Sequence, residues 1–190
     1  MAIDVDAAEE AVRDDLVDRL RAHGIRYIGG GSDWRGDKSP YALPAEAPVP
    51  RLVGDLVASG DTRLQTAAVA LLLRHPEYAG DALTTANTLA GRSRLLVEAS
   101  ILAAAALQST WAFSLDLCMP GWSRIDADAL AARFNLPTPR EDYGRATLDA
   151  LDDLLNRDVP FHADRVGAWQ DVGRHVLDGL REEALAHVET

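Results

Sequence analysis

Residues 50–75, PRLVGDLVASGDTRLQTAAVALLLRH, constrain the fold most strongly because they predict two short helices joined by a tight turn. Gly60 is placed to end the first helix, and Asp61 is a suitable N-cap for the second. Each helix has one apolar face, formed by Leu52, Val53, Leu56 and Val57 in the first and by Leu64, Ala67, Ala68, Leu71 and Leu72 in the second. So short a connection forces the two helices to be antiparallel neighbours, so the segment predicts helix-on-helix packing.

The N-terminal part of the chain predicts one further helix over residues 1–24. Its apolar residues Val12, Leu16 and Leu20 recur every four positions. Asp6 is the predicted N-cap, and Gly24 is predicted to end the helix. Because the apolar stripe is narrow, this helix is expected on the outside of a bundle.

Residues 25–49 are rich in Gly and Pro and predict a long irregular loop between that helix and a helical core at 50–190. The chain as a whole is interpreted as one domain. The glycine-rich turn Gly29–Gly31 is followed by no helix and no phosphate-binding lysine, so it is interpreted as a linker and not as a nucleotide site. Trp34 and Arg35 in this loop are candidate partner contacts.

The helical core continues with helices that are predicted to start at Pro76, Ser93, Asp142 and about Ala163. Residues 95–114 form the most apolar stretch, but Glu98 and Gln108 interrupt it, and much of its apolar content is alanine. It is therefore predicted to be a buried central helix and not a membrane span. Together these patterns predict an all-α, compact bundle of about seven helices.

Charge and cysteine content limit the partners and the compartment. The net charge is −11, and Lys38 is the only lysine, so the chain is expected to repel a nucleic-acid backbone. Cys118 is the single cysteine and has no possible internal disulfide partner. The N-terminus is acidic where a secretory signal is basic. These features predict a cytoplasmic protein with no direct nucleic-acid or membrane partner.

The residues at 50–75 are similar to one HEAT-type repeat. The shared order is L-V-x-x-L-V, then Asp61, then Leu64-Gln65, then Ala68 and Leu71, with Gln65 where the repeat usually has arginine. This resemblance implies HEAT-like antiparallel helix pairs, which commonly serve as protein-binding scaffolds.

A second resemblance covers RLQTAAVALLLRHPEYA, the Ala-rich central helix and IDADALAARFNLP. These segments resemble a group of uncharacterised prokaryotic helical proteins that are often encoded beside nucleotidyltransferases. The resemblance implies a nucleotidyltransferase as the protein partner and supplies no catalytic residue.

Two groups of residues are candidates for chemistry. Glu98 lies on an otherwise apolar helix and needs a partner such as Arg92 or Arg94, or else marks a ligand pocket together with Trp111. Asp171 and His175 are one helical turn apart, and His162 and Asp164 are near in sequence, but such pairs more often lie on a solvated face than at a metal. No cofactor and no catalytic residue is predicted.

The favoured hypothesis is therefore a non-catalytic protein-interaction module, in the manner of a regulatory or antitoxin-like subunit, with Trp34, Arg35 and Trp122 as partner contacts. The alternatives are a small-ligand sensor at Glu98 and Trp111, and a metal-dependent hydrolase that uses His162, Asp171 and His175. Self-association is compatible with each of them.

Overall fold

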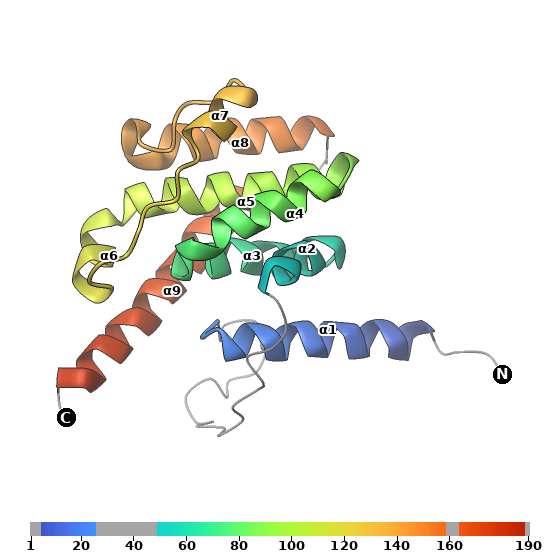
Figure 1. The fold of residues 1–190 in the computed structure, drawn as a ribbon, viewed down its shortest axis with the longest axis horizontal. Helices are drawn as coiled ribbons and strands as arrows, with labels where there is room; N and C mark the ends of the chain where they lie inside the picture. The colour runs from blue at the N-terminus through green and yellow to red at the C-terminus, as the bar shows by residue number, and fades with distance from the viewer. Residues whose placement is uncertain (1–4, 26–48, 159–163, 189–190) are drawn as a thin grey trace.

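The structure is a computed structural model, and it describes residues 5–25, 49–158 and 164–188. Within these ranges every regular element is helical, which confirms the predicted all-α fold (Figure 1). The α-helices are α1 Val5–Ala22, α2 Val49–Ala58, α3 Thr62–Arg74, α4 Ala79–Thr88, α5 Gly91–Thr110, α6 Ala112–Cys118, α7 Asp128–Arg133, α8 Arg145–Asp158 and α9 Arg165–Val188, with short 3-10 helices η2 Pro76–Tyr78 and η3 Glu141–Gly144.

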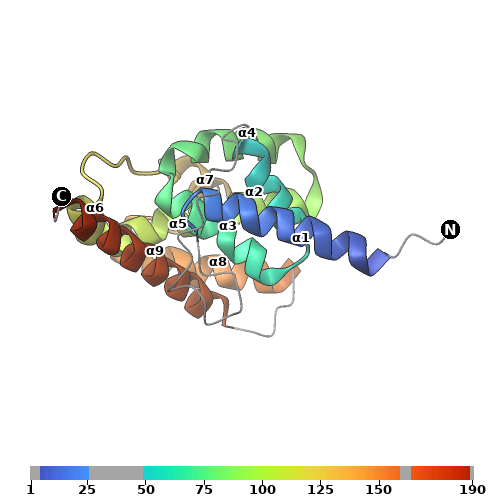
Figure 2. The same cartoon turned by 90° about the horizontal axis from the view of Figure 1, so that it is seen from below.

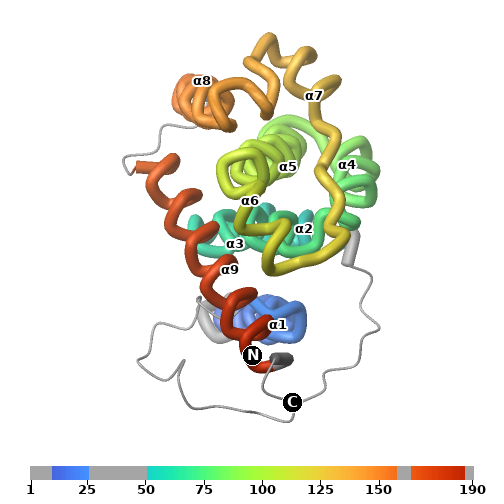
Figure 3. The backbone as a smooth tube through the Cα atoms, turned by 90° about the vertical axis from the view of Figure 1, so that its left-hand side faces the viewer, coloured from blue at the N-terminus to red at the C-terminus, as the bar shows by residue number. Residues whose placement is uncertain are grey.

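Helix α5 forms the centre of the bundle, as its sequence predicts. Every residue from Val97 to Gln108 is buried, and α3, α4 and α8 all pack against it. Seen end-on, α5 is surrounded by these helices (Figure 3). The alanines of this helix allow such close packing on several sides, because their small methyl side chains let the neighbouring helices approach closely. No single helix in the described residues is long and apolar enough to cross a bilayer, although α5 and α6 pass that test jointly as a pair bent by 83°.

Helices α2 and α3 form the predicted helix–turn–helix pair. The Asp61 side chain accepts a hydrogen bond from the backbone nitrogen of Arg63 at 2.8 Å, which satisfies one of the free amides at the start of α3. The apolar faces predicted for both helices are buried. The pair also packs against α5, and α2 packs against α4.

Helix α1 lies on the outside of this pair, where its narrow apolar stripe predicts it (Figure 2). Leu16 and Leu20 are its buried residues, followed by Ile25. Gly24 has a φ of 76°, and this left-handed turn lets the backbone nitrogen of Ile25 donate to the carbonyl of Leu20 at 3.0 Å. The helix begins at Val5, so Asp6 lies within its first turn and not at the predicted cap.

Helix α9 closes the bundle by packing along α3 and contacting α6 and α8. Its buried side includes Trp169, Val176 and Leu180, which recur at helical spacing in the sequence. The carboxylate of Asp164 accepts a hydrogen bond from the backbone nitrogen of Gly167 at 2.7 Å and caps the helix. Ala163, the predicted start, lies outside the described residues.

Two further predicted helix starts, besides Asp6, are wrong. Helix α5 begins at Gly91, so Ser93 lies inside its first turn and does not cap it. Helix α8 begins at Arg145, because Asp142 and Tyr143 have φ values of 46° and 53° and form a left-handed turn instead of a first helical turn. Tertiary contacts set this second boundary.

Candidate functional site

The outer face of α6 carries two of the five large apolar side chains that are exposed in the described part of the chain. Phe113 and Leu117 are one helical turn apart and are 82% and 71% exposed. Leu115, on the opposite side of the helix, is buried. Helix α6 therefore carries apolar side chains on both faces, although only one of them packs against the bundle. Phe113 and Leu117 are called the α6 face below.

A third exposed apolar residue, Tyr143, lies at the same end of α5. It is 78% exposed, and its backbone carbonyl accepts a hydrogen bond at 2.7 Å from the hydroxyl of Thr110, the last residue of α5. Its left-handed backbone costs roughly 1–2 kcal/mol for a residue with a Cβ atom. The turn is held by its neighbour Gly144, whose Cα lies so close to Ala106 that a Cβ there would be 2.1 Å from the Ala106 carbonyl oxygen.

The predicted partner contact Trp122 lies beside α6. Its indole nitrogen donates a hydrogen bond to the carboxylate of Asp116 at 2.7 Å, and the guanidinium of Arg124 lies 5.8 Å from the centre of its ring. The ring is partly buried, so its orientation relative to α6 is fixed. The other two predicted contacts, Trp34 and Arg35, lie outside the described residues.

Glu98 is 2% exposed and forms two ion pairs. Its Oε1 accepts from Arg94 Nε at 2.8 Å, which confirms one of the two predicted partners. Its Oε2 pairs with Arg133 of α7, whereas Arg92, the other predicted partner, is exposed. The carboxylate thus joins α7 to α5, and each of its oxygens is occupied by a guanidinium.

The ligand pocket predicted from Glu98 and Trp111 divides into two separate places. Glu98 lines a shallow pocket of about 250 Å³ together with Arg94, Arg133 and Phe134. Trp111 follows α5 thirteen positions later, which is roughly 20 Å along a helix axis, and it packs against Gly173 of α9. The two side chains therefore do not line one pocket.

The candidate metal ligands are occupied by local contacts. The carboxylate of Asp171 pairs with Arg174 at 2.7 Å, and the Nδ1 of His175 lies 2.7 Å from the backbone carbonyl oxygen of Asp171. His162 lies outside the described residues. Within the described ranges, no group of three or more His, Cys, Asp or Glu side chains is arranged to hold a metal ion.

An aromatic cluster that the sequence did not indicate joins the end of α1 to the end of α3. The rings of His75 and Tyr78 stack with their centres 5.1 Å apart, and His23 meets both rings edge-on. The Nε2 of His75 lies 3.0 Å from the carbonyl oxygen of His23, which only accepts, so this nitrogen carries a proton. Its Nδ1 lies 3.1 Å from the carboxylate of Glu77.

Two pKa values in this cluster are shifted. Burial lowers the pKa of His23 below its ordinary 6.5, and the positive charges of His75 and Arg19 add to that effect. Burial also raises the pKa of Tyr78, with a further contribution from the Glu77 carboxylate. Around neutral pH, His23 is therefore held in its neutral form at the point where α1 is attached.

Comparisons of the chain with protein-family models, curated proteins and solved structures found no match. The class is therefore defined by the described residues alone, as an all-α helical bundle with an apolar face on α6. Phe113, Leu117 and Tyr143 were not among the predicted contacts. The available signal was the segment AFSLDLC, in which apolar residues occur on both sides of one short helix.

Proposed function

We propose that this protein is a non-catalytic interaction module that binds another protein through the α6 face, with Tyr143 and Trp122 at its margins. The observation that carries the proposal is the exposure of Phe113 and Leu117 on one side of a helix whose other side is already packed. Exposed apolar patches of a few hundred Å² on a folded domain commonly mark interaction sites.

The chemistry of these side chains suits a protein partner. Aromatic residues and arginine contribute most to the binding energy at protein interfaces, and this region offers Phe113, Tyr143, Trp122 and Arg124. One of these side chains is held in place before binding, because the Trp122 indole nitrogen donates to the Asp116 carboxylate. A fixed side chain loses less conformational entropy on binding than a mobile one.

The identity of the partner follows only from the sequence resemblance. On that basis we propose a nucleotidyltransferase, with this chain as a regulatory or antitoxin-like subunit built from HEAT-like helix pairs, in the cytoplasm. This proposal can be tested at specific residues, because the partner must cover Phe113 and Leu117 of the α6 face.

The test is co-purification of the tagged full-length protein from its own cells, with Phe113→Ser/Leu117→Ser compared with the native chain. We expect a stoichiometric partner with the native chain and at least tenfold less of it with the double variant. The control is Leu185→Ser, which removes an exposed leucine from the outer side of α9. Equal recovery with all three proteins would refute the role of α6, and a nucleotidyltransferase in the native eluate would support the proposed partner.

Self-association through the same face is a distinct outcome. Light scattering of the purified proteins measures it directly, because a dimer that becomes a monomer in the double variant would assign the face to a second copy of this chain. That result would overturn the proposal of a different partner.

A further inference from the structure

A groove of about 520 Å³ lies between α1 and α2, away from the α6 face. Its floor is apolar and is formed by Val12, Leu16 and Ala58. Leu16 is buried, but Val12 is 60% exposed and is the one large apolar side chain so exposed in the described part of α1. The floor thus offers apolar surface that no described element of the chain covers.

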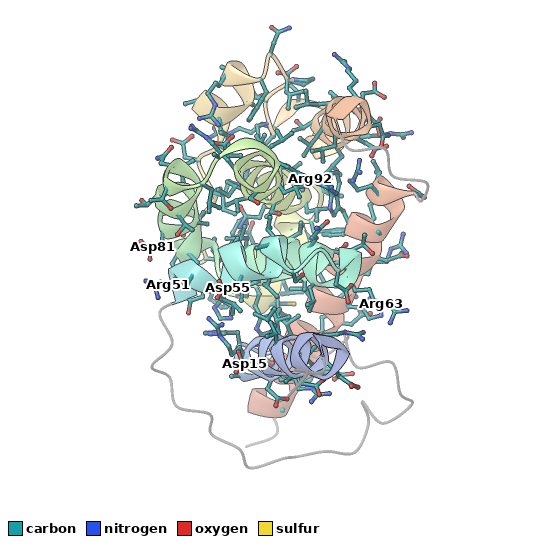
Figure 4. The ribbon with its side chains drawn as sticks, turned by 90° about the vertical axis from the view of Figure 1, so that its right-hand side faces the viewer. Asp15, Arg51, Asp55, Arg63, Asp81 and Arg92 are labelled. Carbon is teal, nitrogen blue, oxygen red and sulfur yellow. The ribbon has the colours of Figure 1, made fainter. Side chains whose placement is uncertain are left out.

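Two carboxylates border this floor, one from each helix. Asp15 of α1 and Asp55 of α2 lie on facing helices at the same side of the molecule (Figure 4). Both share a single guanidinium, since Arg19 Nη1 lies 3.2 Å from Asp55 and 3.8 Å from Asp15. The carboxylates remain largely exposed. With two carboxylates and one guanidinium, the lining of the groove has a net charge of −1. The whole chain has a net charge of −11.

Charge and shape together restrict what the groove accepts. The carboxylates repel phosphate groups, which disfavours nucleic acids and anionic lipid surfaces. A furrow between two helices, with a small alanine on its floor, is the shape into which a third helix packs at the usual interaxial distance of about 8–10 Å. The carboxylates favour a cationic ligand, and the exposed Val12 requires that this ligand also has an apolar side.

We propose that the α1–α2 groove binds a cationic amphipathic helix of a partner protein. The apolar side of that helix covers Val12 and Ala58, and a lysine or arginine on its border pairs with Asp15 and Asp55. This is the helix-in-groove mode of recognition, in which apolar anchors supply affinity and charges at the border set orientation. The site is separate from the α6 face and does not depend on its proposed role.

Binding of a synthetic 14-residue Leu/Lys amphipathic peptide to the full-length protein tests the proposal, with a Leu/Glu peptide of the same pattern as the negative probe. The test variant is Asp15→Asn/Asp55→Asn. Its matched control is Asp149→Asn/Asp153→Asn, which removes the same charge from the exposed side of α8. We expect the first pair to raise the Kd about tenfold and the control pair less than twofold, because charges matter most where they contact the ligand.

Asp55 also pairs with Arg19 in the free protein, so Asp55→Asn changes more than the contact with the peptide. Substitution of the apolar residue Val12 therefore gives a second, independent readout. Val12→Ser alters an exposed side chain, so the fold should persist, and it should raise the Kd for the Leu/Lys peptide about threefold or more. Phe113→Ser/Leu117→Ser should leave the Kd unchanged, which separates this groove from the α6 face.

Two results would overturn the proposal. Equal weakening by both asparagine pairs would mean that the peptide responds to net charge alone. An unchanged Kd for Val12→Ser would mean that it binds elsewhere.

Discussion

Among single residues, Glu98 shows how a buried charge is retained in a mostly apolar core. The carboxylate is almost fully buried, whereas the side chains of its partners Arg94 and Arg133 are 39% and 42% exposed. The desolvation cost therefore falls mainly on the carboxylate, while the guanidinium groups keep part of their hydration. This asymmetry predicts that removal of the carboxylate and removal of the guanidinium groups have different effects on stability.

Replacement of the carboxylate should be tolerated better than replacement of both cations. Glu98→Gln leaves half-exposed arginines that regain water, so we expect a loss of about 1–2 kcal/mol in the free energy of unfolding. Arg94→Gln/Arg133→Gln leaves a buried charge without a counterion and should cost about 3–5 kcal/mol. Urea unfolding followed by circular dichroism measures both. A greater loss for Glu98→Gln would contradict this assignment.

Two glycines of α9 provide a second residue-level prediction. A Cβ atom at Gly173 would lie 1.7 Å from the Trp111 ring, whereas nothing lies within 4 Å of one at Gly179. Gly179→Ala should stabilise the protein by about 0.5–1 kcal/mol through helix propensity. Gly173→Ala should destabilise it by about 1–3 kcal/mol because the ring has to move. The same urea measurements compare them, and a stabilising Gly173→Ala would show that Trp111 does not contact α9 there.

At the level of whole elements, the sequence predicted what local periodicity determines and missed what tertiary contact determines. The turn at Gly60 and Asp61, the central position of α5 and the buried side of α9 follow from the spacing of apolar residues. The start of α8 does not, because the left-handed turn at Tyr143 is held by Thr110 from another helix. Likewise, Arg94 was a predictable partner of Glu98 at four residues' distance, but Arg133 was not.

The candidate site was less predictable than the fold for the same reason. Which side of α6 is exposed depends on where α9 and the bundle pack, and periodicity gives no such information for a helix that is apolar on both sides. Trp122 was favoured because interfaces are rich in tryptophan, yet its indole nitrogen bonds to Asp116 of its own chain. Trp111, the predicted pocket residue, packs against Gly173. The exposed residues Phe113 and Leu117 emerged only from the packing.

The attachment of α1 should depend on pH through His23. Well above pH 6.5 this residue is neutral in the folded and the unfolded chain, so its protonation does not change the free energy of unfolding. As the pH falls below 6.5, the unfolded chain takes up the proton first, because the folded pKa is lowered by burial and by His75 and Arg19. The free energy of unfolding should therefore decrease, and the loss is complete below the folded pKa.

Urea unfolding of the native chain and of His23→Gln between pH 7.5 and 5 measures this contribution as a difference. The neighbouring groups Arg19, His75, Glu77 and Tyr78 are present in both proteins, so the difference between the two curves reports on His23. We expect the native chain to lose more stability than the variant over this interval. Parallel curves, or a native chain that gains relative stability in acid, would be inconsistent with a buried neutral His23.

For the molecule as a whole, the packing predicts a hierarchy of stability centred on α5. Helix α5 packs against each of the helices α2, α3, α4, α6, α7, α8 and α9, whereas the principal contacts of α1 are with α2 and α3 alone. Helix α1 is also held by ion pairs that are partly exposed, such as Arg13 with Asp61 and Arg19 with Asp55, which contribute little each. Elements with few buried contacts open before the protein unfolds globally.

Native-state hydrogen exchange of the full-length protein measures this hierarchy. Amides of α1 should exchange through a local opening of lower free energy than amides in the middle of α5, which should exchange only by global unfolding.

Leu20→Ala and Leu102→Ala form a matched pair, since both side chains are fully buried, one in α1 and one in α5. Leu20→Ala should lower the free energy of the local opening of α1 by about 2–5 kcal/mol, and Leu102→Ala should lower that of global unfolding by a similar amount. Leu20→Ala should lower protection mainly in α1, whereas Leu102→Ala should lower it throughout the bundle. If Leu20→Ala reduced the protection of α5 as much as that of α1, the helix would belong to the cooperative core, and the groove between α1 and α2 would be a rigid part of the fold.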